Sequence, residues 1–375
     1  MKFLHTADLQ IGMKAVQVAE AGERVREERL HALERVVRAA RDHHVEFILV
    51  AGDVFEDNGV DRIWVQRTAD ILAGFGGTVY LIPGNHDPLG PGSVWDHPAW
   101  KSGRGIQILR EEVPVEISAG LLFPCPTREK HSTKNPTAWI TGSRGSGIRV
   151  GVAHGTVEGV NQDEPDYPIP RNAAEQAGLD YLALGHWHST TVYKEQDGAE
   201  RLAYSGTHET TKFGERDSGN VLIVGIPGPG GRPTVTPLRT GSLNWQVLEE
   251  KIHLASDLTR VRENIEAIGN PASTLISIHL SGLLSAETRG EMERVREILS
   301  SRFLFHRLDT THLRPSPGDD SWLINLPPGI IRETASRLRA LADPSFNSER
   351  TAGATPEVAS RALLELYALI EEVHR

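Results

Sequence analysis

Five short apolar segments of this chain each lead into polar residues of types that bind metal ions. The segments are residues 2–6, 47–51, 79–82, 148–153 and 181–184, and because they are too uniformly apolar for half-exposed strands, we expect buried ones. The residues that follow them are Asp8, Asp53, Asn85-His86-Asp87, His154, His186 and His188. Open α/β folds place their sites outside the carboxyl ends of strands, since rigid strands aim side chains better than mobile loops do. The order therefore predicts one site at one edge of a sheet.

Helical segments separate the first three of these strands. Between residues 20 and 43, apolar side chains recur at helical spacing, and a second helix is expected near residues 65–72. This alternation of strand and helix predicts an α/β fold, with a sheet core covered by helices.

The residue types at the strand ends suit divalent transition metals. A mixture of carboxylate, amide and imidazole groups favours manganese, iron or zinc over calcium or magnesium. Cys125 is the only cysteine, which excludes a thiolate zinc site and an intramolecular disulfide. A carboxylate such as Asp53 can bridge two ions roughly 3.5–4 Å apart, and such a pair can clamp the attacking and leaving oxygens of a phosphoryl displacement. We expect Gly52 and Gly84 to let the backbone pass close to these ions.

Each motif alone is weak evidence for a site. A single Asp after a strand is more often a turn residue, and a single His-x-His is more often a surface pair. The pair His43-His44, which ends a helix and has no strand to aim it, is interpreted as structural. Five motifs on five strand ends are a much rarer coincidence.

Taken together, the motifs resemble the calcineurin-like metallophosphoesterases, whose pattern runs Asp-x-His, Gly-Asp, Gly-Asn-His-Asp, His and Gly-His-x-His. The resemblance covers residues 1–220 and implies a β-sandwich flanked by helices, with two divalent metal ions, manganese above iron or zinc. It implies that the first metal is held by Asp8, Asp53, His188 and position 10, and the second by Asp53, Asn85, His154 and His186. His86 would face the phosphate as an acid or transition-state stabiliser, and Asp87 would orient it.

Position 10 departs from the family pattern. The first motif of the family ends in histidine, whereas this chain has Gln10. An amide oxygen is a neutral and weaker ligand than imidazole. We therefore expect the first metal to bind less tightly than the second.

Four narrower segments resemble the SbcD family of DNA nucleases. They are residues 3–8, 51–55, 204–207 and 213–215. This resemblance implies a manganese-dependent exonuclease and endonuclease that processes DNA ends in repair. Trp95 and Trp100, in the loop after Asp87, are considered for stacking on unpaired bases, although packing over the loop is the stronger expectation.

The chain after residue 240 changes in pattern. We expect a metallophosphoesterase domain over residues 1–240, a small α/β domain over 241–315, and a linker with C-terminal helices over 316–375. The resemblance assigns the small domain to capping DNA, and the last helices to docking on an SMC-like ATPase of the SbcC type. Leu363, Leu366, Ile370 and Val373 form an apolar stripe on the last helix, which would either fill a partner's groove or pack back on its own domain.

The net charge and the distribution of charge along the chain point in opposite directions on DNA binding. The net charge of −10 argues against a nucleic-acid partner, but the acid excess lies mainly in the segments rich in ligands. Residues 101–150 carry more bases than acids, and these bases would form either a basic track or a scattered solvated surface. The bases are Lys101, Arg104, Arg110, Arg128, Lys130, Lys134, Arg144 and Arg149.

Two other classes of function stay open, a small-molecule phosphodiesterase and a non-catalytic scaffold with a weakened metal site. A homodimer is also left open. With no apolar run of membrane-spanning length and no signal-like start, we expect a cytoplasmic protein that does not contact membranes.

Overall fold

A computed structural model describes residues 1–101, 105–142, 147–159, 166–285, 288–317, 320–346 and 354–373. The chain divides into two compact units, Met1–Leu243 and Asn244–Arg375. Each unit is described by itself below.

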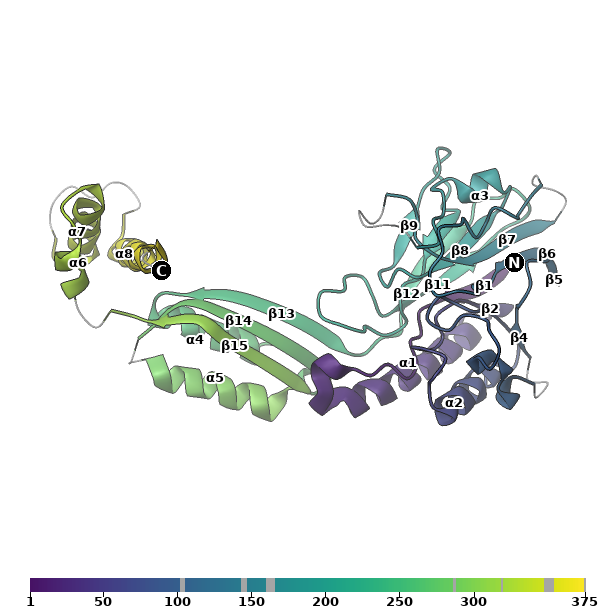
Figure 1. The fold of residues 1–375 in the computed structure, drawn as a ribbon, viewed down its shortest axis with the longest axis horizontal. Coiled ribbons are helices and arrows are strands. Elements are labelled where there is room, and N and C mark those ends of the chain that lie inside the picture. Colours follow the sequence, from purple (N-terminus) through teal and green to yellow (C-terminus); the bar gives the residue numbers. More distant parts are fainter. Residues whose placement is uncertain are drawn as a thin grey trace. The chain divides into compact units, whose positions relative to one another are not determined.

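The first unit contains two six-stranded sheets (Figure 1). The first has the order β12-β11-β1-β2-β3-β4, in which β1 to β4 run parallel and β11 pairs with β1 and with β12 in the antiparallel sense. Its strands are β1 (Lys2–Thr6), β2 (Phe47–Ala51), β3 (Thr78–Ile82), β4 (Ile106–Ile108), β11 (Asn220–Gly225) and β12 (Thr234–Arg239). Helices α1 (Gly22–Asp42) and α2 (Arg62–Ala73) connect the first three strands.

The second sheet has the order β5-β6-β7-β8-β10-β9, with a parallel centre from β6 to β10. Its strands are β5 (Val115–Ile117), β6 (Gly120–Cys125), β7 (Ile148–His154), β8 (Tyr181–Gly185), β9 (Thr191–Tyr193) and β10 (Leu202–Tyr204). The short helix α3 (Ala173–Gln176) precedes β8, and 3-10 turns lie at Val16–Ala21, Val94–Asp96 and Pro98–Lys101.

The inner faces of the two sheets form a shared apolar core. Phe3 of β1 stacks on Phe47 of β2 at a centroid distance of 4.8 Å and meets the edge of Tyr181 of β8 at 5.7 Å. The outer face of the first sheet packs against α1 and α2, and that of the second packs against α3 and its neighbouring loops. The unit is therefore a β-sandwich flanked by helices, as the sequence predicts.

The five strands predicted to carry the site are confirmed within one residue at each end. The prediction that they share one sheet is wrong, because β1, β2 and β3 belong to the first sheet whereas β7 and β8 belong to the second. An apolar segment buried on both sides has the same sequence pattern in either layer of a sandwich, so the pattern does not assign strands to sheets.

The second unit begins with a three-stranded parallel sheet of order β13-β14-β15. It contains β13 (Asn244–Ile252), α4 (Ala255–Glu266), a 3-10 turn at Pro271–Ser273, β14 (Thr274–Leu284), α5 (Arg289–Arg302) and β15 (Phe305–Pro315). Both helices lie on one face of the sheet (Figure 1), where Ile276, Ile278 and Leu280 of β14 pack against them. The alternate residues of the three strands face away from these helices.

The C-terminal helices α6 (Ser321–Asn325), α7 (Ile330–Ala342) and α8 (Pro356–Val373) complete this unit. Leu363 of α8 is buried against α6 and α7, with Leu366 and Ile370 packed at the border of the same cluster, whereas Val373 is 83% exposed. Three of the four residues in the predicted stripe therefore pack within the chain. None of the helices among the described residues combines the length and hydropathy that spanning a membrane requires.

Candidate metal centre

The first two ligand loops, after β1 and β2, are joined by backbone hydrogen bonds. The N–H of Asp8 donates to the carbonyl of Gly52 (3.1 Å), and that of Gln10 donates to the carbonyl of Asp53 (3.0 Å). Asp8, Gln10 and Asp53 all have left-handed backbone, with φ of 53°, 48° and 52°. Non-glycine residues rarely adopt this conformation, which persists only where surrounding contacts enforce it. Both carboxylates are buried.

Donor atoms from other strand ends converge on these carboxylates. Ligand atoms of Asp8, Asp53 and His154 lie within 4.8 Å of one another. Nε2 of His154 lies 3.4 Å from Oδ1 of Asp53 and 2.9 Å from Oδ1 of Asn85. The same Asn85 oxygen lies 3.2 Å from Nδ1 of His186. The structure thus brings these five predicted site residues into one cluster.

Hydrogen bonds outside the cluster occupy one ring nitrogen on each of two histidines. Nδ1 of His154 donates to the carbonyl of Ala51 (2.8 Å), and Nδ1 of His188 donates to the carboxylate of Glu215 (2.7 Å). Metal-binding histidines typically donate one ring N–H to a carbonyl or carboxylate in this way, which leaves the other nitrogen for the metal. Nε2 is therefore the ligand atom that both rings offer.

Two glycines make room for the cluster. A Cβ atom on Gly84 would lie 2.1 Å from Oδ1 of Asp53, and one on Gly52 would lie 2.3 Å from Nδ1 of His154. Gly52 also has a φ of 91°, a backbone conformation that residues other than glycine rarely adopt. Both glycines thus let the backbone pass close to the proposed ligands Asp53 and His154.

The electrostatics of the cluster suit a divalent cation. Burial raises the pKa of Asp8 to about 6. Burial acts in the same direction on Asp53, but the charge and hydrogen bond of His154 outweigh it and lower the pKa of Asp53 to about 2. Burial likewise opposes protonation of His154, but the Asp53 carboxylate raises the pKa of that ring to about 9. In the absence of metal, a proton on His154 therefore offsets the negative charge of the buried Asp53 carboxylate. A metal ion bound by these donors would displace that proton. The donor set fits divalent metal.

His86 and Asp87 are arranged differently from the expectation based on the resemblance. Nδ1 of His86 donates to the carbonyl of Glu56 (2.9 Å). The carboxylate of Asp87, expected to orient His86, instead accepts the N–H groups of Phe55 (2.9 Å) and Gly84 (2.7 Å). Buried backbone N–H groups require a partner, and the fully buried Asp87 supplies it for two of them. Asp87 therefore braces the second and third ligand loops against each other.

Gln10 reaches the cluster through its amide nitrogen. Its Nε2 donates to Oδ2 of Asp53 (3.0 Å), and the side chain is buried. The expectation at this position was a ligand oxygen. In the structure the amide N–H instead donates to the Asp53 carboxylate and offsets part of its negative charge.

Glu215 is a site residue whose role the sequence did not indicate. Its carboxylate accepts Nδ1–H of His188, the backbone N–H of Thr211 (2.8 Å) and the hydroxyl of Thr211. Burial would raise the pKa of Glu215, but the hydrogen bond from His188 lowers it overall. Glu215 and His188 are 27 positions apart, a separation that carries no periodic signal, so only the fold reveals the contact.

Arg29 and Asp166 hold parts of the cluster in position through hydrogen bonds. The guanidinium of Arg29 donates to the carbonyls of Leu9 (3.0 Å), Asp8 (3.3 Å) and Glu209 (2.8 Å), and Asp166 accepts Nδ2–H of Asn85 (3.4 Å). The second bond turns the Asn85 oxygen toward the histidines. Arg29 had a signal in the sequence, because a charged residue stands in the apolar stripe of the first helix.

The predicted basic track is partly occupied by groups of the same chain. Arg110 pairs with Asp96 (3.0 Å), Arg128 pairs with Glu111 (3.0 Å), and the guanidinium of Arg149 lies 4.2 Å from the ring centroid of Phe123. Arg104 and Arg144 lie outside the described residues. The remaining three, Lys101, Lys130 and Lys134, are exposed.

Trp95 and Trp100 are packing residues. They are 0% and 7% exposed, and their ring N–H groups donate to the carbonyls of Asp87 (2.5 Å) and Val94 (2.9 Å). Both rings contact Phe55. They cover the third ligand loop, which is the stronger of the two expectations stated for them.

The family model for calcineurin-like phosphoesterases matches residues 1–190, just over half of the chain. The chain is similar to "Uncharacterized metallophosphoesterase YhaO" of Bacillus subtilis (strain 168), with 27% identity over 206 residues that cover 51% of this chain and 50% of the relative. The aligned region thus spans about half the length of that relative. Among solved structures it is similar to TT1561 of Thermus thermophilus, with a TM-score of 0.41 and 11% identity over 64% of this chain and 98% of that one.

Proposed function

This chain belongs to the calcineurin-like phosphoesterase family, and we propose that within it the protein is a two-metal nuclease that cleaves phosphodiester bonds in DNA, in the end processing that accompanies repair. Metal-dependent hydrolysis of phosphoesters is the chemistry of the family. Its finer assignment to DNA rests on the SbcD-like segments at residues 3–8, 51–55, 204–207 and 213–215.

The observation that carries the proposal is the convergence of donors around Asp53. Oδ1 of Asp53 faces Nε2 of His154 (3.4 Å), whereas Oδ2 accepts the amide of Gln10 (3.0 Å). The two oxygens therefore face different groups, and each would be available to an ion. We propose that the first ion would be held by Asp8, Asp53, His188 and, with its amide turned so that the oxygen faces the ion, Gln10. The second would be held by Asp53, Asn85, His154 and His186. Divalent ions held there, manganese in our proposal, supply Lewis acidity to the phosphoryl oxygens.

His86 is the residue proposed to deliver a proton. Because its Nδ1 is committed to the Glu56 carbonyl, Nε2 is the nitrogen free to act on substrate. The side chain is 39% exposed, and Nε2 lies 4.0 Å from Oδ2 of Asp53, so a phosphoester beside Asp53 is within its reach. We propose that the ring acts as an imidazolium: Nδ1–H stays on the Glu56 carbonyl, and Nε2–H protonates the leaving oxygen or stabilises its charge, which leaves the ring neutral.

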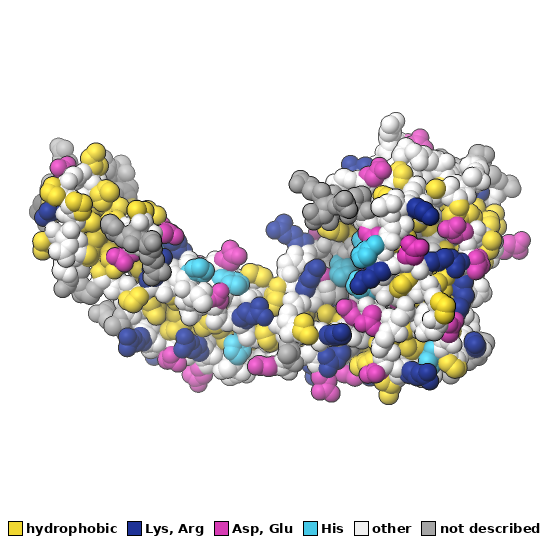
Figure 2. Space-filling view, in the orientation of Figure 1, with side chains coloured by type: hydrophobic (Ala, Val, Ile, Leu, Met, Phe, Trp, Pro, Cys, Tyr) yellow, Lys and Arg dark blue, Asp and Glu magenta, His cyan; other side chains and the backbone are white. Residues whose placement is uncertain are grey.

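We also propose functions for the second unit in a larger assembly. We propose that its α/β part, residues 241–315, caps DNA and that the C-terminal helices dock on an SMC-like ATPase of the SbcC type. Exposed apolar side chains on these helices favour the docking proposal (Figure 2), since contiguous apolar surface commonly marks an interface. They are Ile324, Ile330, Ile331, Val358, Leu369 and Val373.

A small-molecule phosphodiesterase is the second candidate. It is favoured by the engagement of Arg110, Arg128 and Arg149 with the protein's own groups, which leaves less positive surface for a DNA backbone.

The experiment that separates the two uses metal-stripped protein reloaded with Mn²⁺. It is incubated with a labelled hairpin DNA and, in parallel, with bis-p-nitrophenyl phosphate. Metal-dependent cleavage of both supports the nuclease. Hydrolysis of the small phosphodiester without any cut in the DNA would reject it in favour of the small-molecule enzyme.

A further inference from the structure

A cavity of about 390 Å³ lies directly beside the candidate metal centre. Two predicted ligands, His186 and His188, form part of its wall. The rest of the wall comes from Trp187, Ser189 and residues 212–215. A molecule in this cavity would therefore contact the metal-binding residues themselves, although none of the catalytic roles assigned above uses Trp187, Lys212 or Phe213.

The wall formed by residues 212–215 is anchored to the metal centre. Glu215 closes this segment by accepting hydrogen bonds from both Thr211 groups and from Nδ1 of His188. Nε2 of Gln17 donates to the carbonyl of Thr211 (3.2 Å) and holds the other side of the segment. The positions of Lys212 and Phe213 are thus tied to the position of His188, which is what a substrate pocket beside a metal requires.

The chemistry of the wall suits a nucleotide. Trp187 and Phe213 are both partly exposed, and Trp187 also packs against the apolar cluster under the second sheet, which limits the freedom of its ring. Aromatic rings stack on the faces of nucleobases, and any base provides such a face. Lys212 is exposed and adds a positive charge beside the rings. Glu215, the acid in the described wall, already accepts bonds from His188 and Thr211.

We propose that this cavity binds the base of the nucleotide next to the scissile phosphate, with Trp187 and Phe213 contacting the base and Lys212 contacting a neighbouring phosphate. The inference rests on the proposed nuclease function and adds a substrate class to it. A base inside a duplex has no free face, so the nucleotide that enters is unpaired, from a single strand, a hairpin loop or a frayed end.

The first test removes the base and keeps the backbone. Mn-loaded protein is given single-stranded oligonucleotides that differ only in the position of one tetrahydrofuran abasic residue, and cleavage is mapped at each phosphate. Cleavage beside the abasic residue should fall roughly 5- to 150-fold, which corresponds to about 1–3 kcal/mol of stacking. Phe213→Ala and Trp187→Ala should reduce this preference for a base, whereas Trp187→Phe should retain it.

A matched control and a binding assay complete the test. Trp64→Ala changes a partly buried tryptophan on α2, outside the cavity, and should leave the preference for a base intact. Calorimetry on the wild-type Mn protein should show tighter binding of dAMP than of 2-deoxyribose 5-phosphate, by a similar factor. Equal affinity for the two would overturn the base pocket whatever the cleavage results. If no oligonucleotide is cut but dAMP still binds more tightly, the nuclease assignment fails and the pocket stands.

Discussion

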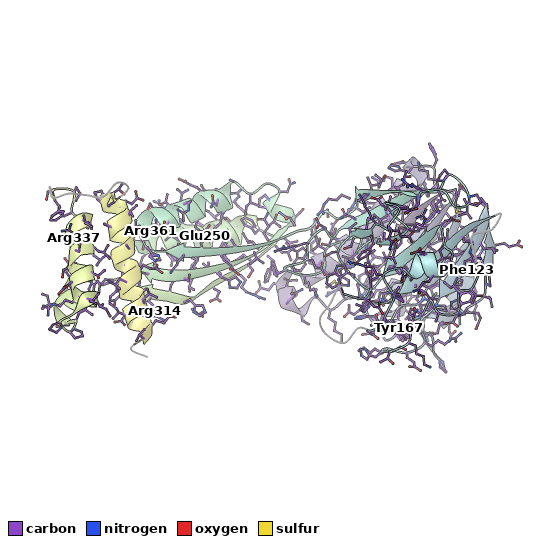
Figure 3. The ribbon with its side chains drawn as sticks, turned by 90° about the horizontal axis from the view of Figure 1, so that it is seen from above. Phe123, Tyr167, Glu250, Arg314, Arg337 and Arg361 are labelled. Carbon is purple, nitrogen blue, oxygen red and sulfur yellow. The ribbon has the colours of Figure 1, made fainter. Side chains whose placement is uncertain are left out.

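The metal centre and the attachment of α8 both depend on charged groups, but they use them in different ways. At the metal centre, Asp8, Asp53 and His154 are buried, and backbone groups fix their orientation. At α8, Arg361 pairs with Asp257 of α4 (2.6 Å and 3.0 Å), and Glu365 contacts Lys251 and His253 (Figure 3 labels Arg361).

The two sets of charged groups differ in how far they are exposed to solvent. Glu365 and Arg361 are 36% and 40% exposed, so solvent competes for one side of each ion pair, which reduces its net contribution to stability. Asp257 itself is buried, but the N–H groups of His253 and Leu254 also donate to it. The metal-centre groups have no such competition, and removing one of them leaves uncompensated buried charge. Changes at the centre should therefore abolish function, whereas changes at α8 should loosen one contact.

Asp53→Ala should have the largest effect. It removes the carboxylate that we propose both ions share, so metal binding and hydrolysis should be lost together. Mn²⁺ calorimetry and turnover of bis-p-nitrophenyl phosphate would measure this, with the exposed acid change Glu112→Ala as control. Retained turnover in purified, folded Asp53→Ala would reject the site assignment.

His86→Ala should lower turnover by roughly 10²–10⁴, the usual contribution of a positioned acid. Metal binding should stay close to that of the wild type, because His86 is assigned to the substrate and not to an ion. The same two assays apply. A parallel loss of Mn²⁺ binding would show that His86 acts as a ligand.

Glu215→Gln should weaken Mn²⁺ affinity by roughly 10–100-fold, which is typical when the group that orients a ligand histidine is replaced. The amide preserves the shape of the side chain but cannot accept the His188 proton with a full negative charge. A Mn²⁺ titration would measure the shift, with Glu112→Gln as the matched surface change. Unaltered affinity would place His188 outside the metal shell.

Gln10→His should tighten the weaker of two Mn²⁺ binding steps by roughly tenfold, the scale of changes close to a metal ion. Imidazole is a stronger ligand than the amide, and it would replace the Gln10–Asp53 hydrogen bond with a metal bond. Calorimetry should resolve two separate steps in the natural protein and closer ones in the variant. Two equally tight steps in the natural protein contradict the account.

Arg361→Ala should have the smallest effect on function. It removes the pair with Asp257, which keeps its bonds from the N–H groups of His253 and Leu254. Hydrogen exchange in α8 should become faster by roughly three- to tenfold, the equivalent of about 0.6–1.4 kcal/mol, while metal-dependent turnover is unchanged. Unchanged exchange in α8 would mean that the apolar contacts of Leu363 alone hold the helix.

The sequence predicted the parts of the molecule that depend on local pattern. The strand ends just before Asp53 and at His154 and the space beside Gly84 follow from apolar runs and from the glycines beside them. The sequence did not predict which side chains contact each other when they lie far apart along the chain. Glu215 contacts His188 and Arg29 contacts Glu209 only because the chain folds back, and no spacing rule connects them.

The same limit explains one departure from expectation and one alternative that the sequence left open. The family resemblance implied that Asp87 orients its neighbour His86, but its carboxylate instead accepts the N–H of Phe55 in the second ligand loop and that of Gly84 in its own loop. The α8 stripe has the pattern of a surface that needs a partner, and the structure supplies much of that partner from α6 and α7. Pattern identifies an apolar face without identifying what covers it.

Arg29 gives the metal centre an order of assembly during synthesis. Its guanidinium, whose pKa burial lowers to about 10 and which is therefore still charged at neutral pH, binds carbonyls of residues 8 and 9 and of Glu209. β1 also pairs with β11, at residues 220–225. A nascent chain that has emerged only as far as residue 100 contains Asp8 and Asp53, but not Glu209, which accepts from Arg29, nor β11, which pairs with β1. The contacts around the centre are therefore complete only after residue 225 has emerged.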